Sequence, residues 1–218
     1  MEAVEPLGPN GPLRLPERLS VRDQVLAALR GAIAGGELAP GSVHSAPALA
    51  ARHGVSATPV REAMQVLARE GAVEVLPNRG FRIAERSARD LAELAEIRAL
   101  LEVPVLLASA RAVPAQRWEA LRPLAEATVA AAALGDGGAY AEADRAFHRA
   151  LLELSGNLQL VAVADDLLRR AQVPRSRSAA RPAELAADAA EHGALLDAVA
   201  AGELAAVESL ARGHLTHP

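Results

Sequence analysis

Cysteine and lysine are both absent from this chain of 218 residues. Without cysteine the protein can form neither disulfides nor thiolate metal sites, so any metal must be held by histidine and carboxylate side chains. Because lysine is also missing, every fixed positive charge is an arginine. The lack of cysteine is consistent with a reducing compartment, and we expect a cytoplasmic protein.

Long apolar runs are missing as well. The longest, such as Val129–Leu134, fall far short of the roughly 20 residues that a membrane-spanning helix needs. Residues 1–16 are acidic and rich in Pro and Gly, unlike the basic and then apolar pattern of a signal peptide. We therefore expect no membrane association and a disordered tip over residues 1–15.

The content of apolar residues, 51%, is high enough to bury a full core, and the length suits two domains. Residues 13–86 carry 10 Arg against 7 acidic residues, whereas residues 87–218 carry 13 Arg against 18 acidic residues. A weakly basic front half and an acidic back half indicate that the two halves have different functions. We place the two domains at residues 16–86 and 87–218.

The front domain shows helical periodicity followed by strand-like alternation. The expected elements are helices over 20–34, 47–52 and 56–70, then strands over 72–76 and 81–84. The turn-forming residues Pro77–Gly80 separate the two strands. This order is that of a winged helix-turn-helix, in which the third helix and the wing approach DNA.

The polar residues of this domain suit contact with DNA phosphates and base edges. Hydroxyl and N–H groups at the start of the third helix can hold a phosphate, and arginines flank them. The predicted DNA-binding residues are Arg52, Ser56, Thr58, Arg61, Arg69, Asn78, Arg79 and Gly80. The alternative is a winged domain used for protein contacts, with its arginines simply solvated.

Nearly everything after Ser87 is predicted to be helical. The expected segments are 87–111, 114–134, 138–154, 158–172, 183–201 and 203–217. Ser87 and Asp90 have the spacing of a capping box, which marks a helix start just after the wing. Pro104 falls inside the first segment and is expected to kink or split it. The predicted fold is mainly α: an N-terminal winged helix-turn-helix followed by an all-α bundle.

Four residues of the bundle have the types and spacings that close a metal site. Asp144 and His148 are four apart, which puts a carboxylate and an imidazole on one helical face. His192 and His214 lie on two later helical segments, so three helices can converge on one ion. Such a set suits a divalent Zn, Ni, Mn or Fe ion and does not choose among them. A lone histidine without any ion remains the alternative reading for each position.

The motifs of the chain resemble those of the GntR transcription regulators, in the FadR-type subgroup whose effector domain is called FCD. In the front half the resemblance rests on Leu38–Gly41, Gly54–Met64, Leu67–Gly71 and Pro77–Gly80. In the back half it rests on Ile97-Arg98 with Glu102, Asp144–His148, Ser155–Asn157, Glu191-His192 and His214-Leu215. It implies a homodimeric, non-enzymatic regulator, expected to be a repressor, that binds a double-stranded, palindromic operator.

The same resemblance implies how the bundle is used. The metal-binding branch of the FCD domain has one Asp and three His as ligands, and this chain fills all four positions. Arg98 resembles an arginine that clamps the carboxylate of a small organic acid, with an ion pair to Glu102 one turn on as the alternative. Asn157 is expected to bind this effector or to support a ligand. The identities of the effector, the metal and the operator, and the direction of regulation, are left open.

One departure from the family pattern concerns DNA reading. Family members usually carry Arg between the Ser and Thr of the turn, where this chain has Ala57. Losing a bidentate Arg contact removes about 1–3 kcal/mol of base discrimination. One alternative is therefore a degenerate regulator that reads bases weakly and acts through protein contacts. A metal-dependent enzyme is a second alternative, although no distinct general base or nucleophile stands out.

Overall fold

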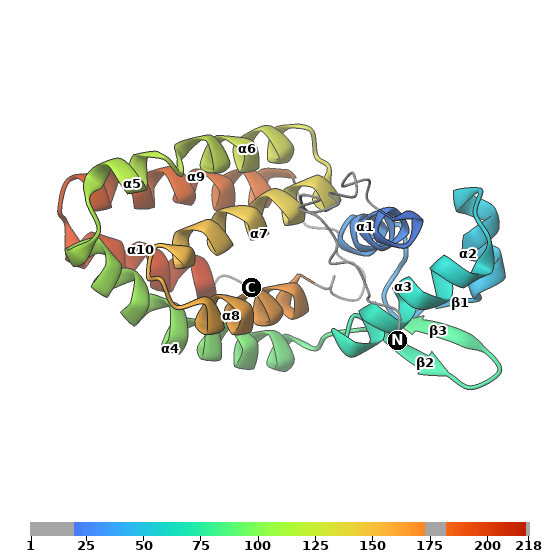
Figure 1. Cartoon of the computed structure of the whole chain (residues 1–218). Helices are drawn as coiled ribbons and strands as arrows, with labels where there is room; N and C mark the ends of the chain where they lie inside the picture. Colours follow the sequence, from blue (N-terminus) through green and yellow to red (C-terminus); the bar gives the residue numbers. More distant parts are fainter. Residues whose placement is uncertain (1–19, 173–181, 217–218) are drawn as a thin grey trace, which may run out of the picture.

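The computed structural model describes residues 20–172 and 182–216, and it shows a winged head followed by a helical bundle (Figure 1). The mainly α fold expected from the sequence is confirmed. The tip over residues 1–15, predicted to be disordered, lies outside the described residues. Among the residues that are described, no helix is long and apolar enough to cross a membrane.

The head consists of three helices and a small antiparallel sheet. Its elements are α1 (Val21–Ala34), β1 (Val43–His44), α2 (Ala46–His53), α3 (Ala57–Arg69), β2 (Val73–Leu76) and β3 (Gly80–Ile83). The predicted helices and both wing strands are confirmed to within about a residue, with α3 ending one residue early. The sheet order is β1-β3-β2, and β1 was not predicted because two residues carry no periodicity.

A single hydrophobic core holds the head together, and one glycine lets its sheet close. Leu29 of α1, Met64 of α3 and Ile83 of β3 have no exposed surface and pack in this core. Gly80 has φ of +110°, and a Cβ there would lie 2.3 Å from the carbonyl oxygen of His44. Only glycine therefore permits the wing turn to approach β1 so closely.

The bundle contains the remaining helices of the described residues. They are α4 (Ala88–Ala112), α5 (Ala115–Glu119), α6 (Arg122–Ala133), α7 (Gly137–Glu153), α8 (Leu158–Ala171), α9 (Pro182–Ala200) and α10 (Leu204–Thr216). The single helix expected over 114–134 is wrong, because the chain turns after Glu119. Pro123 lies in the first turn of α6, where its missing N–H costs nothing, and it marks this restart.

The first bundle helix continues through its proline. Of the two effects expected of Pro104, a kink or a split, the split is wrong, since α4 continues unbroken for 25 residues. Pro104 and Leu100, whose carbonyl loses its partner to the proline ring, are both exposed. Water can therefore satisfy that carbonyl, and the packing of the opposite face of α4 against α8 and α10 maintains the helix.

The head meets the bundle mainly where α1 packs against α7 (Figure 1). The contact is made by glycines: a Cβ on Gly138 would lie 2.8 Å from the carbonyl oxygen of Gly31. Two separate hollows border these two glycines, one lined also by Arg145 and Gln172, the other also by Arg52. At this junction, which we call the glycine ridge, the backbone of Gly31 on α1 therefore lies directly against the backbone of Gly138 on α7.

Candidate metal centre and DNA interface

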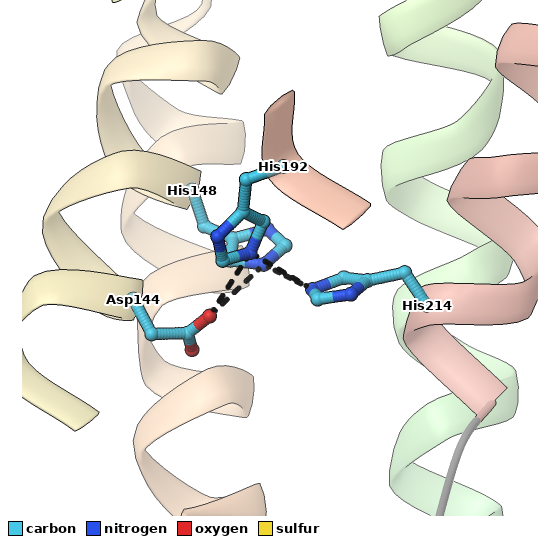
Figure 2. Close-up of side chains that lie close together, drawn as sticks. All are labelled: Asp144, His148, His192 and His214. Atoms are coloured by element: carbon cyan, nitrogen blue, oxygen red, sulfur yellow. Dashed lines mark hydrogen bonds and ion pairs between the residues drawn. The ribbon is translucent and has the colours of Figure 1, made fainter. Parts of the chain in front are cut away.

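Three helices of the bundle bring together the four residues expected to bind metal (Figure 2). α7 carries Asp144 and His148, α9 carries His192, and α10 carries His214. One potential ligand atom from each residue lies within 4.8 Å of the other three. Asp144, His148 and His192 are buried, and His214 is half-buried, so the cluster is largely removed from solvent.

The ligand atoms point at a common centre. Nε2 of His214 lies 3.0 Å from Nε2 of His148 and 3.2 Å from Nε2 of His192. Oδ1 of Asp144 lies 3.3 Å from Nε2 of His192 and 3.6 Å from Nε2 of His148. The spacing of Asp144 and His148 by one helical turn produces this convergence, as the sequence indicated.

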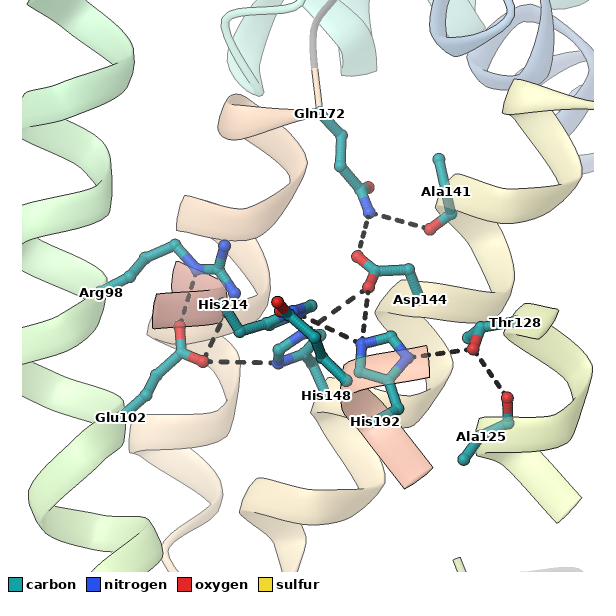
Figure 3. A network of polar contacts seen from close by, with 11 residues as sticks. Arg98, Glu102, Ala125, Thr128, Ala141, Asp144, His148, Gln172, His192 and His214 are labelled. Carbon is teal, nitrogen blue, oxygen red and sulfur yellow. Dashed lines mark hydrogen bonds and ion pairs between the residues drawn. The ribbon is translucent and has the colours of Figure 1, made fainter. Parts of the chain in front are cut away.

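The outer nitrogen of each imidazole faces an acceptor (Figure 3). The hydroxyl of Thr128 donates to the carbonyl of Ala125 at 2.7 Å, so it must accept from Nδ1 of His192 at 3.0 Å. Oε2 of Glu191 lies 2.8 Å from Nδ1 of His214. Oε2 of Glu102 lies 3.6 Å from Nδ1 of His148. These partners place the protons on Nδ1 and leave the Nε2 lone pairs facing the centre.

This arrangement fits a divalent cation. With protons on Nδ1, the Nε2 atoms of His148, His192 and His214 face each other at hydrogen-bond distance with no proton to share. Their lone pairs repel one another unless a positive charge lies between them. Neutral imidazoles with one carboxylate, each oriented by an outer hydrogen-bonding partner, form a donor set that the common divalent metals accept.

The electrostatics favour the protonation states that bind metal. Burial lowers the pKa of His192, partly opposed by Asp144, and burial together with His148 and His192 lowers the pKa of His214 well below its usual value. Burial opposes ionisation of Asp144, but the neighbouring histidines outweigh it and lower the pKa of its carboxyl group. Neutral imidazoles and an ionised carboxylate are what metal coordination requires.

The two predicted effector residues are placed differently. Arg98 is buried beside the cluster, where its Nε donates to Oε1 of Glu102 at 2.8 Å (Figure 3). Asn157 is exposed and caps α8, its Oδ1 accepting from the backbone N–H of Leu160 at 3.1 Å. Asn157 does not line the cavity beside the histidines.

Sequence reasoning missed the outer partners of the cluster. Thr128 and Gln172 are 64 and 28 residues from the ligands that they contact, so only the folded chain shows their role. Glu191 directly precedes His192 in a motif but contacts His214 instead. Nothing in the local sequence distinguishes Thr128 and Gln172 from ordinary polar surface residues, and Glu191 stood out only as the neighbour of His192 in that motif.

The predicted DNA-binding residues lie on the head. All are exposed except Gly80, which is half-buried in the wing turn: Arg52, Ser56, Thr58, Arg61, Arg69, Asn78 and Arg79. Ser56 is the N-cap of α3 and its side chain makes no capping bond. Gln65, which was not predicted, is exposed one turn after Arg61 on the same side of α3. Ala57 is half-buried and packs against the head core.

Two family models match the chain. The model of the FCD domain matches residues 93–217, and that of "Bacterial regulatory proteins, gntR family" matches residues 21–83. An "uncharacterized HTH-type transcriptional regulator in unstable DNA locus" from Streptomyces ambofaciens is 35% identical over 82% of this chain and 75% of its own length. A "probable D-xylose utilization operon transcriptional repressor" from Paenarthrobacter nicotinovorans is 31% identical over 92% of this chain and 86% of its own.

The chain is also similar to solved structures. "E. coli McbR/YncC" aligns with a TM-score of 0.72 and 27% identity, covering 91% of this chain and 94% of the other. A putative GntR regulator from Rhodococcus sp. RHA1 aligns with a TM-score of 0.67 and 24% identity, over 89% and 93% of the two chains, which bears on the fold alone.

Proposed function

Because this chain belongs to the GntR family of HTH-type transcriptional regulators and carries an FCD domain, we propose that it is a metal-dependent sensor of a small organic acid. In this proposal a divalent ion held by Asp144, His148, His192 and His214 binds the carboxylate of the effector. Binding then changes the affinity of the heads for a palindromic operator. The chain is a regulator and not an enzyme.

The observation that carries the proposal is the convergence of three Nε2 lone pairs and one carboxylate oxygen. A divalent ion in this set would supply Lewis-acid positions that four protein ligands leave open to a carboxylate. Arg98 lies beside the cluster and adds positive charge, although Glu102 now pairs with it. Glu102, Thr128 and Glu191 hold the imidazoles in the orientation that coordination needs.

α7 provides a direct route from this centre to the DNA-binding head. Asp144 lies six residues after Gly138, about 9 Å along the helix at 1.5 Å per residue. Gly138 contacts the backbone of Gly31 on α1, and neither residue has a side chain that could change its rotamer. A shift of α7 must therefore move α1 as well. We propose that ligand binding displaces α7 and thereby reorients α1 and its head. Differential affinity for the two arrangements then regulates DNA binding.

The division of the chain follows from this arrangement. We propose a DNA-binding unit at residues 16–86 and a ligand-binding, dimerising unit at residues 87–218, acting in the cytoplasm. Two copies related by a two-fold axis would present two α3 helices to the halves of a palindrome. The proposed DNA contacts are those of the exposed residues Arg52, Ser56, Thr58, Arg61 and Arg69, with the wing residues 78–80.

Metal analysis of the purified protein tests the centre. We expect about one divalent ion per subunit, largely lost in His148→Ala and kept in His53→Ala, whose histidine is exposed at the end of α2. Protein purified without chelator that contains no metal would refute the sensor.

Fluorescence anisotropy with DNA from upstream of its own gene tests the DNA-binding head. We expect salt-sensitive binding tighter than to random DNA, and equal binding to both would favour the degenerate regulator.

A further inference from the structure

A small cavity lies beside the three histidines, and its walls are aliphatic. Five leucines line it, drawn from four helices: Leu106 of α4, Leu151 of α7, Leu195 of α9, and Leu210 and Leu215 of α10. His148, His192 and His214 form its polar end, and neither Asp144 nor Arg98 borders it. A ligand that reached the open positions of the ion from this cavity would have its body against the leucines.

Two carboxylates, those of Glu102 and Glu191, also line this cavity, and both are already engaged. Glu102 accepts from Arg98 and faces Nδ1 of His148, and Glu191 contacts Nδ1 of His214. No serine, threonine, asparagine or glutamine lines the cavity, and its walls present almost only carbon atoms. A hydroxyl group placed among the leucines would have no partner, which costs roughly tenfold in affinity or more.

Arg98 does not offer a free clamp either. Its guanidinium and the carboxylate of Glu102 are both buried and joined at 2.8 Å. Glu102 thus already supplies the carboxylate that a guanidinium clamp would take from a ligand. The ion must therefore bind the carboxylate of the acid, and the cavity must hold its tail.

We infer that the effector is a short saturated aliphatic acid, with its carboxylate on the ion and its hydrocarbon tail among the five leucines. This inference rests on the proposed metal-dependent sensor and narrows its ligand class. It disfavours polyhydroxylated acids, because the polar lining residues other than the histidines are Glu102 and Glu191, whose carboxylates are already engaged. Burial of each added methylene raises affinity by about fourfold until the cavity is filled.

Isothermal titration calorimetry of the metal-loaded, full-length protein with a series of simple acids tests this. The probes are acetate, butanoate, hexanoate and 4-hydroxybutanoate, whose hydroxyl lies at the far end of the chain, where chelation of the ion would need an unfavourable seven-membered ring. We expect affinity to rise from acetate to butanoate, and 4-hydroxybutanoate to bind at least about tenfold more weakly than butanoate. Equal or tighter binding of 4-hydroxybutanoate would overturn the inference, as would affinity independent of chain length.

A cavity variant tests the placement of the tail. Leu106→Ala enlarges the cavity and should shift the preference towards hexanoate relative to butanoate, while Leu167→Ala, which removes a buried leucine outside the cavity, should not. Metal content and a cooperative melting transition show whether each variant is folded. If Leu106→Ala is not, Leu210→Val makes a milder enlargement at a half-buried lining residue. An unchanged preference in a folded lining variant would also overturn the inference.

The two levels of proposal fail in different ways. If binding is the same after the metal is stripped, the sensor itself is refuted and the ligand class with it. If none of these acids binds the metal-loaded protein, or if acids bind only with metal but the hydroxylated one binds best, the aliphatic effector is refuted and the sensor is not. Each result of the titrations therefore decides at least one of the two.

Discussion

Gln172 donates from Nε2 to Oδ2 of Asp144 at 2.9 Å and from the same nitrogen to the carbonyl of Ala141 at 2.9 Å (Figure 3). Both amide hydrogens are thereby used on α7. One carboxylate oxygen of Asp144 is fixed by Gln172, which leaves Oδ1 to face the histidines. Gln172 caps the end of α8 and also borders one hollow at the glycine ridge.

Removing this amide should weaken the metal site. We expect Gln172→Ala to reduce metal affinity about 10- to 100-fold, the usual effect of losing a partner that orients a ligand. Competition with a chromophoric chelator measures this, and Gln116→Ala, an exposed Gln on α5, is the matched control. The absorption spectrum of the Co²⁺-loaded protein should change as well, since the carboxylate is free to rotate. Wild-type affinity together with a wild-type spectrum would show that Gln172 does not position Asp144.

The cluster could be predicted from the sequence while its supports could not. Asp144 and His148 share a helical face at any tertiary arrangement, because their spacing equals one turn. Gln172 and Thr128 acquire their roles only when α8 and α6 pack beside the ligand helices, and no periodicity encodes such packing. The same limit applies to the break between Glu119 and Arg122, because tertiary packing and not the local apolar pattern decides where that segment turns.

Two other differences between the predicted and the observed elements arise from contacts with neighbouring elements. Pro104 was expected to kink or split α4, and it does not split it, because the exposed side of a helix tolerates proline when packing on its other face maintains the helix. Strand β1 is too short to alternate and exists because β3 offers it an edge. Both outcomes depend on neighbours far away in the chain, which explains why the architecture was predicted better than its details.

The glycine ridge should be sensitive to a single methyl group. In Gly138→Ala the new Cβ would lie 2.8 Å from the carbonyl oxygen of Gly31, so α1 and α7 must separate. We expect a loss of about 1–3 kcal/mol in the free energy of unfolding, typical of overpacking, and altered DNA affinity with unchanged metal content. Urea denaturation and anisotropy titrations measure these.

The partner glycine provides the matched control for this prediction. A Cβ on Gly31 meets nothing within 4 Å, so Gly31→Ala should instead raise stability by about 0.5–1 kcal/mol through helix propensity. If both variants behave alike, the close approach at Gly138 is not what limits the head–bundle contact.

Acidification should destabilise the metal-free protein at a higher pH than the range in which carboxyl groups titrate. The pKa values of His192 and His214 are lowered in the folded state from the ordinary 6.5. Below pH 6.5 the unfolded chain therefore binds more protons than the folded one, and the free energy of unfolding falls as pH falls. Thermal melts between pH 8 and 5 should show the melting temperature declining below about 6.5.

Replacing one of these histidines isolates its share of that pH dependence. His192→Gln should flatten the decline in melting temperature, whereas His53→Gln, at an exposed position, should leave it intact. A melting temperature that stays constant down to pH 5 in the wild-type protein would contradict the burial of neutral imidazoles.

We expect Ala57 to limit how the head reads DNA. It is the first residue of α3, half-buried between the exposed Ser56 and Thr58, and its methyl group cannot hydrogen-bond a base. Ala57→Arg should increase the preference for operator over random DNA by about 1–3 kcal/mol if its guanidinium reaches a guanine. Ala51→Arg adds the same charge on exposed α2 and should strengthen binding to both DNAs alike. Anisotropy at several salt concentrations separates the two effects, and equal gains from both variants would show that position 57 does not face the bases.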